Sequence, residues 1–147
     1  MNKYIYKEIV IATRISEVWK AWTEAEIITK YFAPEAKIEM RLGGMYEIYF
    51  LLNNPPGSRG GEGNQILSFV PQKMLSFSWN APPQFPNVRK EKTWCVLFFE
   101  KLDLNSTKIK FYHLGWKDGE EWDQVYDYFH KAWDYVLGNL KKYFEHK

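Results

Sequence analysis

The sequence predicts an α+β fold in which a curved antiparallel sheet of six to seven strands wraps around one long C-terminal α-helix. Segments between residues 36 and 114 alternate apolar and polar side chains, which is the period of strands with one buried face. Residues 122–144 instead carry apolar side chains at helical spacing. Because a chain of 147 residues has the usual size of one domain, we predict a single domain over residues 1–147.

The chain is expected to begin with a strand and two short helices. The strand covers residues 4–13, and the first helix begins at Ser16, a residue type that caps helix N-termini. Thr23 and Glu26 have the spacing of a capping box, in which each side chain accepts the other residue's backbone N–H group. The second helix therefore begins there and ends near Tyr31, before a proline.

Six more strands are expected between this helix pair and the C-terminal helix. They cover residues 36–42, 46–50, 65–70, 74–79, 94–102 and 108–113. Alternation with two lysines places Ile109, Phe111 and His113 on the inner face of the last strand. Strand 94–102 is apolar on both parities, so its inward face stays open. The loop at residues 80–87 holds three prolines and is expected to be extended and irregular.

The C-terminal helix, from Trp122 to Phe144, has the strongest pattern in the chain. Asp118 and Glu121 have capping-box spacing at its start, and lysines near its end complement the helix dipole. Its apolar stripe consists of Trp122, Val125, Tyr126, Phe129, Trp133, Val136, Leu140 and Phe144. Such a stripe is by default core packing against the sheet.

Composition excludes several classes of protein. Aromatic residues make up 18% of the chain, an excess that suits either a thick core or the wall of an apolar pocket. The net charge of +2 is spread along the sequence without a basic stripe, so no nucleic-acid partner is expected. No apolar run approaches the ~20 residues that span a bilayer, and the N-terminus lacks a signal-peptide pattern. We therefore expect a cytoplasmic protein without membrane insertion.

Motifs for catalysis and metal binding are weak. His113, His130 and His146 lack metal-ligand spacing, and Cys95 is the single cysteine, so neither a metal nor another cofactor is expected. No Gly-x-Ser-x-Gly nucleophile motif occurs. The glycine-rich segment 57–63 lacks the Gly-Lys-Ser/Thr ending of a phosphate-binding loop, so a flexible hairpin loop is expected there. No catalytic residue is predicted from spacing.

Several short motifs occur in the order found in a known family. They are Val18-Trp19 in the first helix, Gly43-Gly44, Pro71 followed by Leu75-x-Phe77-x-Trp79, Thr107 with His113-x-Gly115, and the aromatic C-terminal helix. This set resembles the START-like, birch-pollen-allergen-like superfamily, also called SRPBCC. Within it, the chain is similar to homologues of the activator of the heat-shock-protein-90 ATPase, along almost its whole length.

The resemblance implies a helix-grip fold whose groove, between the sheet and the C-terminal helix, holds an apolar small molecule or lipid. Some relatives are aromatases, cyclases or hydrolases. Two positions depart from the family pattern: Tyr31 stands where Trp is frequent, and Ala132-Trp133 stands where Gly-Trp is frequent. The extra methyl group of Ala132 is expected to narrow the groove. The eukaryotic co-chaperone has a further N-terminal domain that is not found in this sequence, so ATPase activation is not expected.

The first functional hypothesis is non-enzymatic binding of an apolar or aromatic small molecule or lipid in that groove. The predicted ligand contacts are Tyr46, Ile48, Phe50, Phe77, Trp79, Ile109, Phe111, His113, Tyr126, Phe129 and Trp133. Whether the groove is open or filled by these bulky side chains does not follow from the sequence. His113 is read either as a hydrogen-bonded core residue or as a polar anchor for the ligand.

Two alternatives remain open. One is a cyclase- or dehydratase-type enzyme that uses His113 as general acid or base, with Tyr126 positioning the substrate. The other is a protein-interaction module, either chaperone-associated or a homodimer. Residues 94–99 motivate it, because a strand that is apolar on both parities leaves one apolar face outside the core.

Overall fold

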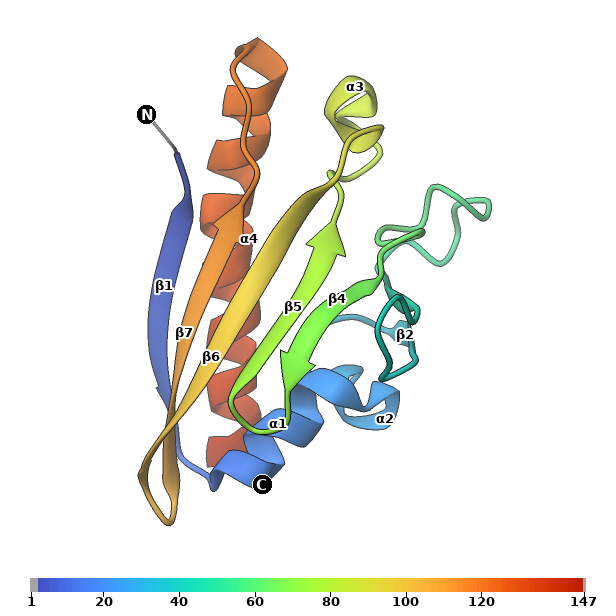
Figure 1. Ribbon diagram of the computed structural model, residues 1–147. Coiled ribbons are helices and arrows are strands. Elements are labelled where there is room, and N and C mark those ends of the chain that lie inside the picture. The colour runs from blue at the N-terminus through green and yellow to red at the C-terminus, as the bar shows by residue number, and fades with distance from the viewer. Residues whose placement is uncertain (1–2, 147) are drawn as a thin grey trace.

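The computed structural model describes residues 3–146, which form an α+β domain, as predicted. In chain order the elements are β1 (Ile5–Ile11), α1 (Ile15–Thr23), α2 (Ala25–Ile28), β2 (Glu35–Ile38), β3 (Tyr46–Tyr49), β4 (Ile66–Val70), β5 (Met74–Trp79), α3 (Pro86–Arg89), β6 (Thr93–Asp103), β7 (Ser106–Leu114) and α4 (Glu120–Glu145). Helix α4 lies along one face of the sheet, α1 and α2 lie at one end of it, and α3 lies at the other (Figure 1).

The strands form two antiparallel sheets rather than one. Five strands pair in the order β1-β7-β6-β5-β4, and β2 pairs only with β3. The two sheets are linked by an isolated bridge between Met45 and Gln65. Beside this bridge, Gly43 N–H donates to the Ile66 carbonyl at 2.9 Å and Ile66 N–H donates to the Gly44 carbonyl at 2.8 Å. A register shift between Ile66 and Ser68 interrupts the β4–β5 ladder at the same place. The predicted total of six to seven strands is thus five plus two.

Strand parity gave the inward faces of the sheet correctly where the pattern was clear. Ile109, Phe111 and His113 on β7 are all completely buried, as predicted. Strand β6, whose inward face the alternation does not predict, buries Cys95 and Leu97 among other alternate residues. Its other parity faces outward, so large apolar side chains of β6 lie outside the core.

The first predicted helix caps are wrong. Helix α1 begins at Ile15, one residue before the predicted cap Ser16, and no side chain caps it. Thr23 ends α1 instead of starting α2, and its hydroxyl donates to the Trp19 carbonyl at 2.8 Å. The N-cap of α2 is Glu24, one residue after the predicted cap; its backbone is extended and its side chain makes no capping hydrogen bond. Helix α2 also ends early, at Ile28, and residues 29–32 continue as turns.

The capping box predicted for α4 is also wrong, and its carboxylate has another role. The N-cap of α4 is Gly119, without a side-chain cap. Glu121 instead accepts hydrogen bonds from the backbone N–H of Val88 at 2.6 Å and from the Asn87 amide at 3.1 Å. These donors belong to α3, a short helix inside the segment expected to be irregular; Pro86 suits its first position. Glu121 therefore fixes α3 to α4.

Candidate functional site

A pocket of about 300 Å³ opens between α4, the end of β5 and three loops. Its lining residues are Phe32, Phe50, Leu51, Gly60, Gly61, Trp79, Asn80, Pro82, Pro83, Gln84, Tyr128, Phe129, Ala132, Trp133, Tyr135 and Val136. None of these side chains is charged, and seven of them are aromatic. The pocket therefore presents an apolar, ring-rich surface with a few neutral polar groups at its rim, which is the usual character of a small-molecule site.

The structure brings four of the predicted ligand contacts to this pocket. Phe50, Trp79, Phe129 and Trp133 line it. Six others are completely buried in the core, away from the pocket: Tyr46, Ile48, Phe77, Ile109, Phe111 and His113. Tyr126 is half-buried on another side of α4, where its hydroxyl donates to the Tyr4 carbonyl at 3.1 Å.

Aromatic side chains fill the deep part of the groove between sheet and helix. The Trp133 ring lies 4.5 Å from Phe111, 5.4 Å from Trp79 and 5.8 Å from Phe32, centre to centre. Tyr46 stacks on Phe77 at 4.3 Å. Offset and edge-on contacts of this kind stabilise a core beyond the area they bury. The pocket lies at the end of the groove where residues 80–84, which precede α3, approach α4.

His113 is part of the packed core and makes hydrogen bonds with both ring nitrogens. The indole N–H of Trp133 donates to Nδ1 at 3.0 Å, and the Thr93 hydroxyl lies 2.7 Å from Nε2. An indole can only donate, so Nδ1 must be the unprotonated nitrogen of a neutral imidazole. It follows that Nε2–H donates to Thr93, whose hydroxyl in turn donates to the Trp79 carbonyl at 3.3 Å.

Burial lowers the pKa of His113 from 6.5 to about 3. A histidine that has no exposed surface, does not line this pocket and holds two hydrogen bonds has no route to a substrate proton in the pocket. The geometry therefore gives the enzyme hypothesis based on His113 no support. The same contacts make His113 a hydrogen-bonded core residue.

Two buried indole N–H groups, those of Trp22 and Trp79, have no hydrogen-bond acceptor among residues 3–146. Trp22 is completely buried and does not line the pocket, whereas Trp79 does. Leaving such a donor unpaired is unfavourable by about 1–3 kcal/mol. Trp79 thus lines the pocket with its ring, while its indole N–H is itself buried.

Sequence reasoning missed most of the pocket rim. Tyr128, Ala132 and Tyr135 follow one another at i, i+4 and i+7 along α4, on the flank of the predicted stripe. That spacing was available as a signal that the apolar face of α4 is wider than its core stripe. Phe32 and the loop residues at 51, 60–61 and 82–84 carry no such signal, because long-range folding alone brings them to α4. Ala132, noted as a departure from the family pattern, does line the pocket.

An antiparallel sheet packed around a C-terminal helix, with an apolar pocket between them, defines a helix-grip domain. The family model described as "Activator of Hsp90 ATPase homolog 1-like protein" matches residues 12–145. The chain therefore belongs to this family, whose fold is of the START-like or SRPBCC type. No curated protein matches the chain.

Solved structures agree with this fold at low sequence identity. Protein MLL2253 from Mesorhizobium loti is 16% identical, with 95% of each chain covered and a TM-score of 0.75. The Aha1 dimer from Colwellia psychrerythraea is 17% identical, with 97% of this chain and 96% of that chain covered and a TM-score of 0.73. CalU16 from Micromonospora echinospora is 19% identical, covering 97% and 74%, with a TM-score of 0.70.

Neither a metal-ligand group nor a membrane-spanning helix is found in the part of the chain that the structure describes. Within residues 3–146 no group of three His, Cys, Asp or Glu side chains is placed to hold a metal ion. None of the helices in that range is long and apolar enough to cross a bilayer.

Proposed function

We propose that this protein binds a neutral apolar or aromatic small molecule, or the apolar part of a lipid, in the pocket between α4 and β5. The observation that carries this proposal is a pocket whose wall is rich in aromatic rings and has no charged side chain. A cavity of ~150 Å³ holds one benzene molecule, so about 300 Å³ suits a ligand of two or three fused rings. A charged ligand group would lose its hydration there without gaining a partner.

A variant that fills the pocket tests this proposal. Ala132→Phe places a ring in the space that the ligand needs, so we expect at least a tenfold weaker affinity for N-phenyl-1-naphthylamine, a neutral fluorescent aromatic probe. Fluorescence titration measures the affinity, and thermal unfolding followed by circular dichroism shows whether the variant is folded. The matched control is Lys131→Phe, which adds the same side chain at the neighbouring exposed position of α4.

Probe binding that is absent in the native protein, or equal in Ala132→Phe and Lys131→Phe, contradicts the proposal. In the first case the pocket takes no aromatic ligand, and in the second the probe binds elsewhere.

A second proposed function, self-association, is favoured by the outer face of the sheet. Tyr6, Trp94, Phe98 and Tyr112 form an outer aromatic strip across β1, β7 and β6; Tyr112 lies 4.7 Å from Tyr6 and 6.0 Å from Phe98 between ring centres. Trp94 and Phe98 are 41% and 43% exposed. Contiguous apolar surface of this kind marks interfaces. The relative from Colwellia psychrerythraea is described as a dimer.

Sedimentation equilibrium tests the outer aromatic strip. We expect the native protein to form dimers as its concentration rises, and Phe98→Lys to remain monomeric because the lysine must keep its charge hydrated. Leu104→Lys is the control, since Leu104 is exposed at the β6–β7 turn and apart from the strip. A native protein that is monomeric at high concentration argues against this function.

A further inference from the structure

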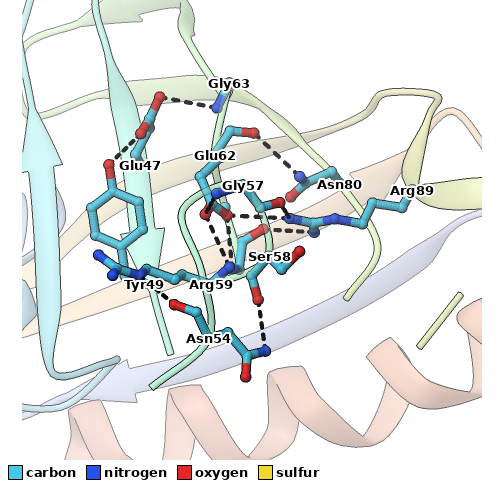
Figure 2. A network of polar contacts seen from close by, with 12 residues as sticks. Glu47, Tyr49, Asn54, Gly57, Ser58, Arg59, Glu62, Gly63, Asn80 and Arg89 are labelled. Atoms are coloured by element: carbon cyan, nitrogen blue, oxygen red, sulfur yellow. Dashed lines mark hydrogen bonds and ion pairs between the residues drawn. The ribbon is translucent and has the colours of Figure 1, made fainter. Parts of the chain in front are cut away.

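A network of polar contacts holds the wall of the pocket that faces α4. Its centre is the carboxylate of Glu62 (Figure 2). One oxygen, Oε2, accepts the backbone N–H groups of Gly57 at 2.7 Å and Arg59 at 2.9 Å; the other, Oε1, accepts that of Gly60 at 2.8 Å. Three backbone donors of one segment thus converge on a single side chain. We call this segment, residues 57–63, the glycine loop.

The glycine loop is shaped for this convergence. Gly57 and Gly60 have φ angles of +97° and +144°, in a backbone region that residues other than glycine rarely adopt. A Cβ atom at Gly60 would lie 2.7 Å from the Phe50 ring. Both glycines therefore let the backbone turn around the carboxylate, and Gly60 also lets it lie directly against Phe50.

The Arg89 side chain, which comes from α3, donates hydrogen bonds to the glycine loop. Its Nη1 donates to the carbonyls of Gly60 at 2.7 Å and Ala81 at 2.6 Å, and its Nη2 donates to the Gly57 carbonyl at 2.7 Å and to Glu62 Oε1 at 3.1 Å. The two side chains are only 15% and 20% exposed. Since Arg89 ends α3, and Glu121 fixes α3 to α4, the glycine loop is connected to the opposite wall of the pocket.

The loop in turn positions four residues of the pocket. Gly60 and Gly61 line it directly. The Arg59 carbonyl accepts the backbone N–H groups of Phe50 at 2.8 Å and Leu51 at 2.9 Å, both of which are lining residues. Phe50 and Leu51 are 39% and 43% exposed, so little core packing holds them. Their placement depends on the glycine loop.

We propose that Glu62 and Arg89 are positioning residues for the ligand pocket: they hold the glycine loop, and through it Phe50 and Leu51, in the arrangement that closes this wall. The inference rests on the proposed function, because it concerns how tightly the same pocket holds its ligand. Ligand affinity then depends on the negative charge of Glu62, although Glu62 does not line the pocket.

Charged and titratable groups around Glu62 agree with an ionised carboxylate. Arg89 pairs with it directly, and Lys92 donates to its backbone carbonyl at 3.3 Å. Tyr49 and Glu47 lie beyond the loop, where the Tyr49 hydroxyl donates to Glu47 and Glu47 accepts the N–H of Gly63 at 2.9 Å (Figure 2). The Arg59 guanidinium points to another acceptor, the Asn54 carbonyl, at 2.8 Å.

Burial by itself raises the pKa of the Glu62 carboxyl. The backbone N–H groups that donate to it together lower the pKa by more, so the net pKa lies below the ordinary 4.5. A lowered folded-state pKa means that the network is complete above pH 4.5 and weakens as pH falls through the folded value. We therefore expect the affinity of the native protein for the probe to be constant from pH 8 to 5 and to fall below about pH 4.5, as Glu62 takes up a proton.

Glu62→Gln tests the positioning role. Both carboxylate oxygens accept two hydrogen bonds each, so an amide loses one pair whichever way it turns. At pH 7 we expect at least tenfold weaker binding of N-phenyl-1-naphthylamine, and no further loss on acidification. Amide hydrogen exchange at Gly57, Arg59 and Gly60 should be at least tenfold faster, with unchanged exchange in β6 and β7.

The matched control is Glu91→Gln, which neutralises a carboxylate paired with Lys117 at the surface beyond α3. We expect it to leave probe affinity, its pH profile and loop exchange as in the native protein. Two results overturn the positioning role: native affinity in Glu62→Gln despite faster loop exchange, or equally faster exchange in β6 and β7, which means general destabilisation. A native protein that binds no probe instead refutes the proposed function itself, so the two failures are distinguishable.

Discussion

Trp133→Ala is expected to lower the free energy of unfolding by about 3–4 kcal/mol, near the low end of the range for buried Trp→Ala substitutions. Trp133 is 1% exposed and touches Phe111, Phe129 and Trp79. Its removal also leaves the Nδ1 atom of His113 without a donor. The loss stays near the low end because part of the ring borders the pocket, where fewer neighbours pack against it. Denaturant unfolding measures it.

Trp133→Phe keeps a ring in the core, although a smaller one, and removes the N–H that pairs with Nδ1 of the buried His113. We expect a cost of about 1–3 kcal/mol, less than that of Trp133→Ala, since most of the ring packing remains. Probe titration on the same samples should show altered affinity for Trp133→Ala, whose cavity adds to the pocket. A loss of 3–4 kcal/mol with unchanged probe binding would mean that Trp133 serves the core only.

The sequence predicted best those elements whose pattern depends on neighbours along the chain. The alternation of β7 and the helical spacing of α4 were sufficient to place Ile109 and Trp133 inside. Helix caps failed because competing partners were not visible in the sequence. Glu121 has the right spacing for a capping box but accepts hydrogen bonds from Val88, more than thirty residues earlier in the chain.

The pocket was predicted less well than the fold, for a geometric reason. Strand parity tells which side chains face inward, but not how deep each lies between sheet and helix. Tyr46 and Phe77 do face inward, yet they stack on each other and fill the groove. The open part is bounded by the glycine loop and the proline-rich loop, whose approach to α4 depends on contacts such as that of Arg89 with Gly60. The glycine loop, which the sequence predicts to be a flexible hairpin loop, is thus held in place by hydrogen bonds from Arg89.

The hydrogen-bond chain from Trp133 through His113 to Thr93 works only while the imidazole is neutral. Protonation would place an N–H on Nδ1 facing the indole N–H of Trp133, so that two donors would oppose each other at 3.0 Å. Together with the burial that lowers the pKa of His113 to about 3, this makes the folded protein resist a proton that the unfolded chain accepts near pH 6.5.

We therefore expect stability to fall as the pH is lowered from 6.5 to 5. The folded-state pKa is below the unfolded one, so unfolding takes up a proton in this window and the free energy of unfolding drops by about 2 kcal/mol. The window lies above the ordinary carboxyl value of 4.5, which separates His113 from Glu62 and other acids. Urea unfolding at several pH values measures the fall.

In His113→Gln the amide can still accept from Trp133 and donate to Thr93 without titrating, so the fall in stability should disappear even if the variant is less stable throughout. His130→Gln, at an exposed position of α4, should keep the full fall. A native protein of constant stability between pH 6.5 and 5 would show that His113 accepts a proton within the fold.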